Sequence, residues 1–172
     1  MAFKLAGSLS PFGGPILRAS IVANSVTISE LHSVKLSSGF VALGTTAALV
    51  YGNVKAIQTN EGVGLNTTGA AGAAIGSFVG TFATASDNQT VGKVRVNVDI
   101  SKETLYSVSP DATIATTTGS NLLGYYTDIA DKVNTSESSA LTTILQYFIH
   151  GVDPLNSSNQ IVNVARSVVF GT

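Results

Sequence analysis

The chain has 172 residues, of which 44% are hydrophobic and only 11% are charged, and its formal net charge is −1. This composition excludes intrinsic disorder, which needs few apolar residues and a high net charge, and it lacks the basic excess that nucleic-acid binding requires. Cysteine is absent, which excludes thiol nucleophiles, thiolate metal sites and disulfides, and the length predicts one domain.

The first 18 residues are predicted to form an extended N-terminal arm, ahead of a single β-barrel domain at residues 19–172. Pro11 and Pro15 bracket a Phe-Gly-Gly tripeptide and favour an extended chain there. The alternative is an N-terminal strand that completes the barrel. The segment contains no apolar run of the length that a signal peptide needs, so no export signal is expected.

The remaining sequence is dominated by short segments with the pattern of β-strands. The clearest is residues 93–100, in which Val94, Val96 and Val98 alternate with polar residues, as in a half-buried strand. Turn-forming clusters separate the segments, and no long helical pattern intervenes, which favours a mainly β protein, an antiparallel barrel or sandwich with little helix. In chain order the predicted strands are residues 19–28, 33–36, 40–43, 48–57, 77–83, 93–100, 104–108, 141–149 and 161–170.

Two long stretches, residues 36–54 and 62–86, contain no charged residue. Gly72, Gly76 and Gly80 in the second stretch have the GxxxG spacing of packed membrane helices. Most residues of that stretch are small or hydroxylated, however, whereas a spanning helix consists mainly of large apolar residues. Both stretches are therefore predicted to be glycine-rich strands and loops, and neither a membrane nor a nucleic acid is expected as a partner.

Two histidines are the candidates for acid–base chemistry. His32 shares a strand face with Val34 and Leu36, which favours a core or capping histidine over a catalytic one. His150 and Asp153 can be drawn as a base and its orienting carboxylate. No serine-nucleophile motif accompanies them, so the preferred interpretation is a polar strand end followed by a turn.

Metal and nucleotide sites receive no support from the sequence. Asp111, Asp128 and Asp131 offer oxygen ligands, but their spacing lacks the alternating acid, Asn and Gly pattern of a calcium loop. The glycine-rich residues 62–80 contain neither a dinucleotide-binding fingerprint nor a P-loop. No metal, no cofactor and no catalytic residue are therefore expected, and the chain is predicted not to be an enzyme.

The order of elements in residues 34–172 resembles that of a known family. A strand and a Ser-Ser-Gly turn lead into GFVALGTTAALVYGNV at residues 39–54, followed by EGVG and a run of small residues. Two strands, a turn and a Gly-Tyr-Tyr segment follow in KVRVNVDISKETLYSVSPDATIATTTGSNLLGYYTDIA at residues 93–130. This order is similar to that of the decoration proteins of tailed bacteriophages, also called cement or auxiliary capsid proteins.

The resemblance implies a small β-barrel or β-tulip protein, made in the host cytoplasm and bound to the capsid surface of the virion. Its partners would be the major capsid protein and its own copies, commonly as a homotrimer, and no catalytic residue carries over. Few charges suit such a protein, because an unpaired Lys or Glu is costly to bury against a shell. Members of the family often clasp their neighbours with an N-terminal arm, which would make the candidate anchors Phe3, Leu5, Phe12, Ile16, Leu17 and Arg18.

Two other functions are compatible with the sequence. One is a β-sandwich adhesive or binding module, such as the base of a head or tail fibre, or a bacterial surface or pilus subunit. The lack of Trp and the small number of Tyr, five, count against sugar binding, because aromatic rings stack on sugars. The other is a hydrolase built around His150 and Asp153.

Overall fold

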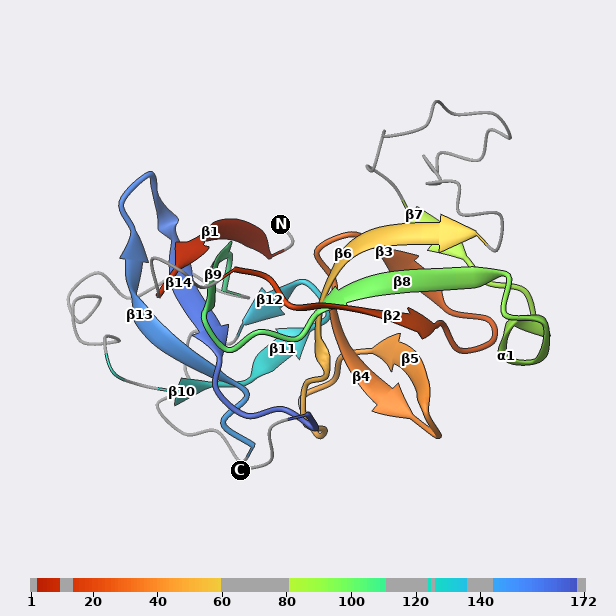
Figure 1. The fold of residues 1–172 in the computed structure, drawn as a ribbon. Coiled ribbons are helices and arrows are strands. Elements are labelled where there is room, and N and C mark those ends of the chain that lie inside the picture. The colour runs from red at the N-terminus through yellow and green to blue at the C-terminus, as the bar shows by residue number, and fades with distance from the viewer. Residues whose placement is uncertain are drawn as a thin grey trace.

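The computed structural model describes residues 3–9, 14–59, 81–110, 124, 126–135 and 144–169. Over these residues the chain is mainly β, and every pair of named strands is antiparallel. Two five-stranded sheets, here called sheet A and sheet B, form the two halves of the molecule (Figure 1). Within the described ranges the only helix is the short α1 (Asn88–Val91), and no helix there is long and apolar enough to cross a membrane.

The strand order of each sheet departs from the order along the chain. Sheet A contains, from edge to edge, β1 (Lys4–Ser8), β9 (Thr104–Val108), β14 (Asn156–Val164), β13 (Tyr147–Asp153) and β10 (Tyr126–Thr127). Sheet B contains β2 (Leu17–Ile21), β8 (Val94–Asp99), β6 (Gly52–Thr59), β4 (Ser33–Ser37) and β5 (Phe40–Leu43). Two small sheets pair β3 (Thr27–Ser29) with β7 (Thr81–Ala83) and β11 (Ile129–Asp131) with β12 (Asn134–Thr135).

Strand β8 follows the alternation predicted for residues 93–100. Val94, Val96 and Val98 are buried, and Arg95 between them is exposed. The valines belong to a core that sheet B encloses, because successive side chains of a strand point to opposite faces. The prediction of a half-buried strand is therefore confirmed.

Sheet B curls but does not close into a barrel. Val41 on β5 forms a single bridge with Val22, just beyond β2, and the backbone N–H of Ala23 donates to the carbonyl of Val41 at 2.8 Å. The chain then turns away at Ser25, whose φ is +52°, so the two edges make no continuous ladder. The prediction of a mainly β, antiparallel barrel or sandwich is confirmed, and of its two forms the described residues fit sandwich-like sheets and not a closed barrel.

Sheet A has a second, more aromatic core. The ring of Phe3 stacks on that of Tyr147, with centroids 5.0 Å apart and planes inclined by 29°. The same ring meets Tyr106 edge-on at 6.2 Å. All three side chains are fully buried and pack with the aliphatic residues of β9, β13 and β14. The described residues therefore form two hydrophobic cores, one for each large sheet.

Several strand boundaries differ from the predicted ones. Predicted strand 19–28 is divided into β2 and β3, because the chain turns at residues 24 and 25. Predicted strand 141–149 begins at Tyr147 as β13, after Leu145 at a positive φ of 62°. Residues 77–80, 141–143 and 170 lie outside the described residues. Three short strands were not predicted, namely β10, β11 and β12, whereas β1 corresponds to the N-terminal strand that was the alternative to an arm.

Two described parts of the N-terminal segment, β1 and the start of β2, are part of the sheets, which corrects the prediction of an extended arm at residues 1–18. Strand β1 pairs with β9 in sheet A, and Leu17 and Arg18 already belong to β2 in sheet B. Phe3 is 0% exposed, and burying its ring in the chain's own core offsets the entropy of ordering the segment. The structure therefore places no boundary between residues 18 and 19 and follows the alternative, an N-terminal strand that completes a sheet.

Replacing Phe3 by Ala should strongly destabilise the protein, because the substitution removes a buried ring from between two tyrosines. We expect the free energy of unfolding to fall by about 3–5 kcal/mol, measured by urea denaturation. Leu5→Ala is the matched control, since Leu5 is 57% exposed, and it should cost about 0.5 kcal/mol or less. Equal, small effects of the two substitutions would show that the N-terminal segment is detached in solution.

Candidate functional site

His32 is a buried structural histidine. It lies between β3 and β4, is 6% exposed, and its Nδ1 accepts a hydrogen bond from the backbone N–H of Ser29 at 3.2 Å. Burial lowers its pKa to about 4, and the positive charge of Lys132 acts in the same direction against the opposing effect of Asp131. The imidazole is thus neutral near pH 7 and caps the turn, as its position in the sequence predicted.

His150 and Asp153 do not form a dyad. Nε2 of His150 lies 3.0 Å from Oδ1 of Asn163. The Asp153 carboxylate accepts hydrogen bonds from Oγ of Ser107 and, at 2.9 Å, from the backbone N–H of Leu155. These bonds hold the pKa of Asp153 below its usual range. The two side chains have separate partners, which agrees with a polar strand end followed by a turn.

The candidate calcium ligands also have structural partners. Asp128 accepts hydrogen bonds from the backbone N–H groups of Ile144 and Gln146, at 3.2 and 3.0 Å. Asp131 accepts them from the two residues that close the β11–β12 turn. Asp111 lies outside the described residues. Within the described part of the chain, no group of three or more His, Cys, Asp or Glu could hold a metal ion.

The predicted arm anchors are distributed over different parts of the fold. Phe3 lies in the core of sheet A and is not available to a partner. Leu5 is exposed on the edge strand of sheet A, whereas Ile16 and Leu17 are exposed beside the edge strand of sheet B. Arg18 is also exposed. Phe12 lies outside the described residues. The described anchors therefore do not form one continuous clamp.

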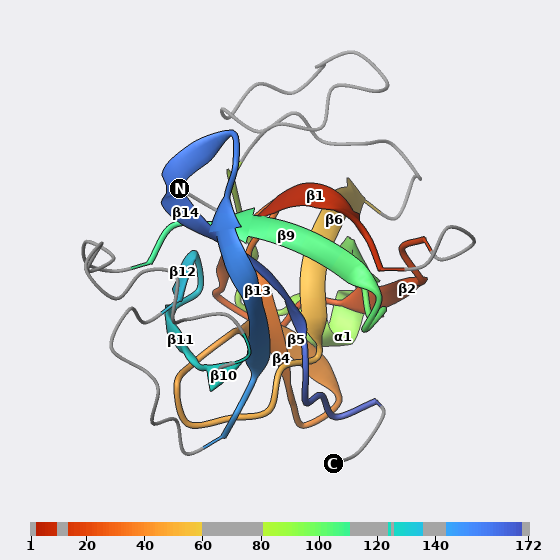
Figure 2. The same ribbon diagram turned by 90° about the vertical axis from the view of Figure 1, so that its left-hand side faces the viewer.

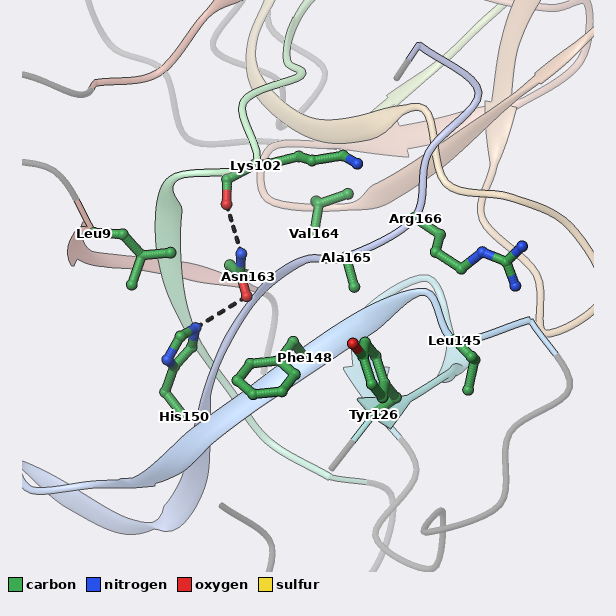
Figure 3. Close-up of a pocket in the computed structure, with 10 residues that line it drawn as sticks. All are labelled: Leu9, Lys102, Tyr126, Leu145, Phe148, His150, Asn163, Val164, Ala165 and Arg166. Atoms are coloured by element: carbon green, nitrogen blue, oxygen red, sulfur yellow. Dashed lines mark hydrogen bonds between the residues drawn. The ribbon is translucent and has the colours of Figure 1, made fainter. Parts of the chain in front are cut away.

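The outer face of sheet A carries a groove, which we call the outer groove (Figure 3). The side chain of Tyr147 points towards sheet B. Phe148 is the next residue of β13, so its side chain points away from sheet B. Asn163 lies opposite Phe148 on β14 and points the same way. The cavity has a volume of about 600 Å³. Its lining consists of Leu9, Lys102, Tyr126, Leu145, Phe148, His150, Asn163, Val164, Ala165 and Arg166.

Three rings form the wall of the outer groove. Tyr126 on β10 lies opposite Phe148 on β13, and their rings meet edge-to-face with centroids 5.3 Å apart. Phe148 meets the ring of His150 in the same manner at 5.0 Å. Figure 3 shows the three rings side by side, with Leu145 and Leu9 at the two ends of the row. A row of rings that is open to solvent is suited to receiving an apolar group.

Asn163 fixes the orientation of His150 in this wall. Nδ2 of Asn163 donates to the carbonyl of Lys102 at 2.6 Å, so its Oδ1 must be the atom that faces His150. That oxygen only accepts hydrogen bonds, and Nε2 of His150 must therefore carry a proton. In the neutral imidazole the lone pair is then on Nδ1, and Figure 3 shows this atom pointing away from Asn163. The hydrogen bond to Asn163 therefore leaves Nδ1 as the acceptor nitrogen of the neutral ring.

The outer groove is positively charged. Lys102 and Arg166 line it, and none of its ten lining residues is Asp or Glu. One guanidinium nitrogen of Arg166 donates to the carbonyl of Ile144 at 3.3 Å, which holds the side chain at the groove. Since the whole chain has only nine Lys and Arg, two of them beside one apolar groove favour an occupant with negative charge.

The turn between β13 and β14, here called the hairpin tip, comprises residues 153–156. Leu155 at the tip is 94% exposed, and the other large apolar side chains that are exposed reach at most 57%. The turn is held by the bond from Leu155 to Asp153 and by a bond from the backbone N–H of Ser158 to Oδ1 of Asn156 at 3.1 Å. The tip therefore presents a fixed apolar side chain to solvent.

A polar seam lies between the two cores. Asp99 on β8 is 0% exposed, and its carboxylate accepts a hydrogen bond from the hydroxyl of Tyr106 on β9. Lys55 on β6 lies with its Nζ 4.8 Å from the centre of the Tyr106 ring. Glu30 has a buried Oε1 with no hydrogen-bond partner. Burial raises the pKa of Glu30 to about 7, although the positive charge of Lys55 acts in the opposite direction.

Sequence analysis missed both the outer groove and the seam. The groove joins residues of β10, β13 and β14, and their register cannot be read from one sequence. A signal was nevertheless present, because Tyr147 and Ile149 alternate with Phe148 and His150, which predicts two rings on one face of the strand. The seam left no such signal, since Asp99 has the position of a solvent-facing residue in the alternation of β8.

Replacing Glu30 by Gln should raise stability selectively at high pH. The stability that the protonated carboxyl contributes is complete below its unfolded pKa, near 4.5, and is lost as the pH rises through about 7. Glutamine stays neutral, so Glu30→Gln should match the parent near pH 4.5 and exceed its stability at about pH 8, measured by urea unfolding. Glu103→Gln, at an exposed position, is the control. Identical pH profiles for Glu30→Gln and the parent would contradict the buried position of Glu30.

The neutral form of His150 should be the Nε2–H tautomer, because Asn163 Oδ1 accepts its proton. Long-range nitrogen–proton NMR spectra of the imidazole distinguish the two tautomers. Asn163→Leu removes the acceptor and should give a mixture of tautomers at His150, whereas His32 should keep its Nε2–H form in both proteins, because its Nδ1 accepts from Ser29. An Nδ1–H form of His150 in the parent would show that the Asn163 amide is turned the other way.

Comparison of the chain with protein-family models, with curated proteins and with solved structures gives no match.

Proposed function

We propose that the chain is a structural virion protein, a decoration protein that binds the outside of a tailed-bacteriophage head and stabilises the capsid. In this role it binds the major capsid protein and its own copies, as a homotrimer. The observation that carries the proposal is the outer face of sheet A, which combines an apolar groove with a protruding leucine at the hairpin tip. Such surfaces on a small protein mark sites of protein association.

The described titratable side chains favour a structural role over catalysis. His32, Asp99, Asp128 and Asp153 each hold a turn or a strand end through hydrogen bonds to neighbouring groups. His150 is held by Asn163 and has no carboxylate partner among the described residues. The low charge of the chain also favours a structural role, because an uncharged surface loses little solvation free energy when a shell covers it.

A second candidate, an adhesive or ligand-binding module, is favoured by one observation. Tyr126, Phe148 and His150 form a row of rings with a cationic rim, and such rows also receive small ligands. In that case the isolated protein would bind glycans or cells without a shell.

Purified protein should add to heads of the source phage that lack it, in a fixed ratio to the major capsid protein. The decorated heads should rupture at a higher temperature than bare ones, because binding of the native shell stabilises it by mass action. Calorimetry and electron microscopy of the same preparation measure both effects. Heads that bind no protein, or that gain no thermal stability from it, would contradict the proposed function. Binding to a glycan array by the isolated protein would favour the second candidate.

A further inference from the structure

We infer that copies of this chain associate head to tail, with the hairpin tip of one copy seated in the outer groove of the next. The inference rests on the proposed function for the expectation that the chain binds its own copies. It adds the contact that joins them, a second copy as the occupant of the groove, and the residues on each side. The donor side is Leu155 with its turn, and the acceptor side is the wall formed by Tyr126 and Phe148.

The hairpin tip has the properties of an inserted element. Leu155 is 94% exposed, so its side chain contributes almost nothing to the fold of its own copy. Pro154 precedes it, and the Asp153 carboxylate fixes the turn through the backbone N–H of Leu155. A tip that is already ordered loses little conformational entropy on binding, and burying its leucine removes a large apolar surface from water.

The outer groove has the complementary properties. Its wall consists of the rings of Tyr126, Phe148 and His150, and leucines line both ends. Tyr126 is 41% exposed, so part of this apolar wall faces solvent in a single copy. A volume of about 600 Å³ accommodates a proline–leucine turn with room for water at the rim. Seating the tip in the groove covers exposed apolar surface on both sides of the contact.

The charges of the two surfaces are opposite. Lys102 and Arg166 line the groove without any acid. Asp153 is the only charged residue of the hairpin tip, and its hydrogen bonds keep the pKa of its carboxyl low, so it is ionised near pH 7. Asp153 is only 9% exposed, so its charge acts at some distance and not through a direct ion pair. This complementarity favours the tip of another copy over a basic or neutral partner.

The positions of tip and groove require two copies. Phe148 and Leu155 lie at opposite ends of β13 and its turn, and strands rise about 3.3 Å per residue, which separates them by roughly 20 Å. Figure 2, in which sheet A faces the viewer, shows the β13–β14 hairpin extending away from β10. A chain therefore cannot insert its tip into its own groove. Each copy offers one tip and one groove, and such a contact either closes into a ring, as in a trimer, or continues as a filament.

The test uses variants that disable one side at a time in the full chain. Leu155→Ser removes the inserted side chain, and Tyr126→Asp places a negative charge in the acceptor wall. Arg166→Glu is a second groove variant in case Tyr126→Asp fails to fold. The matched controls are Leu36→Ser and Thr90→Asp, which change exposed residues of β4 and α1 on the other half of the molecule. Circular dichroism and thermal unfolding establish that each variant is folded.

Light scattering coupled to size exclusion gives the mass of each protein. The parent and both controls should be oligomers, whereas each tip or groove variant alone should have the monomer mass of 17.6 kDa. A one-to-one mixture of Leu155→Ser with Tyr126→Asp should form a dimer of twice that mass, because the intact groove of the first binds the intact tip of the second. Only a head-to-tail contact predicts this recovery.

Several outcomes would overturn the inference. A groove variant that keeps the parent mass would show that the groove is not used, as expected if two tips pack against each other. Two monomeric variants that stay monomeric when mixed would show that tip and groove are not partners. A monomeric parent that still decorates heads would overturn the head-to-tail contact and the homotrimer, and leave capsid decoration standing. An oligomer that behaves as predicted but binds no heads would overturn the capsid role alone.

Discussion

The buried carboxylate of Asp99 is the constraint on which the relation between the two sheets depends. One oxygen accepts hydrogen bonds from the backbone N–H groups of Ile16 and Ser101, at 3.1 and 3.0 Å, and the other accepts from the hydroxyl of Tyr106. These donors come from the segment before β2, the connection that follows β8, and sheet A. A buried carboxylate is tolerated only when such partners satisfy it, so all three segments must meet at this point. Gly52 allows β6 to approach as well, since a Cβ there would lie 2.2 Å from the carbonyl oxygen of Asp99.

Two further polar contacts complete the junction. The hydroxyl of Tyr147 on sheet A bonds Oγ of Ser33 and Oδ1 of Asn53 on sheet B, at 2.9 and 3.1 Å. Gln146 donates to the carbonyls of Thr45 and Ala48 and accepts from the backbone N–H of Ile129. The two hydrophobic cores are thus joined by directional hydrogen bonds, which set a single arrangement of the sheets where apolar contact alone would allow several. Several polar side chains of the described residues thus form hydrogen bonds inside the molecule.

Charged groups that are buried or half-buried in the molecule are not available to its surface. A chain with 11% charged residues in which Asp99 is buried and Lys55 and Glu30 are half-buried has few charges left to cover its exterior. The outer face of sheet A accordingly carries rings and aliphatic side chains between Lys102 and Arg166. Surfaces of this composition are suited to being covered by another protein.

The sequence by itself determined the fold class, because alternation of valines in β8 and β-branched segments between turns identify strands and their faces without knowledge of their partners. It also favoured a core or capping role for His32 over a catalytic one. The tertiary structure alone decided the rest. Phe3 was predicted to lie on an arm because nothing nearby in the sequence shows the two tyrosines that bury it. Asp99 occupies a solvent-facing position in the alternation, yet it is buried, since Tyr106 of β9 and Ile16, just before β2, approach it. Periodicity reports which face a side chain occupies, whereas only the pairing of distant strands decides what covers that face.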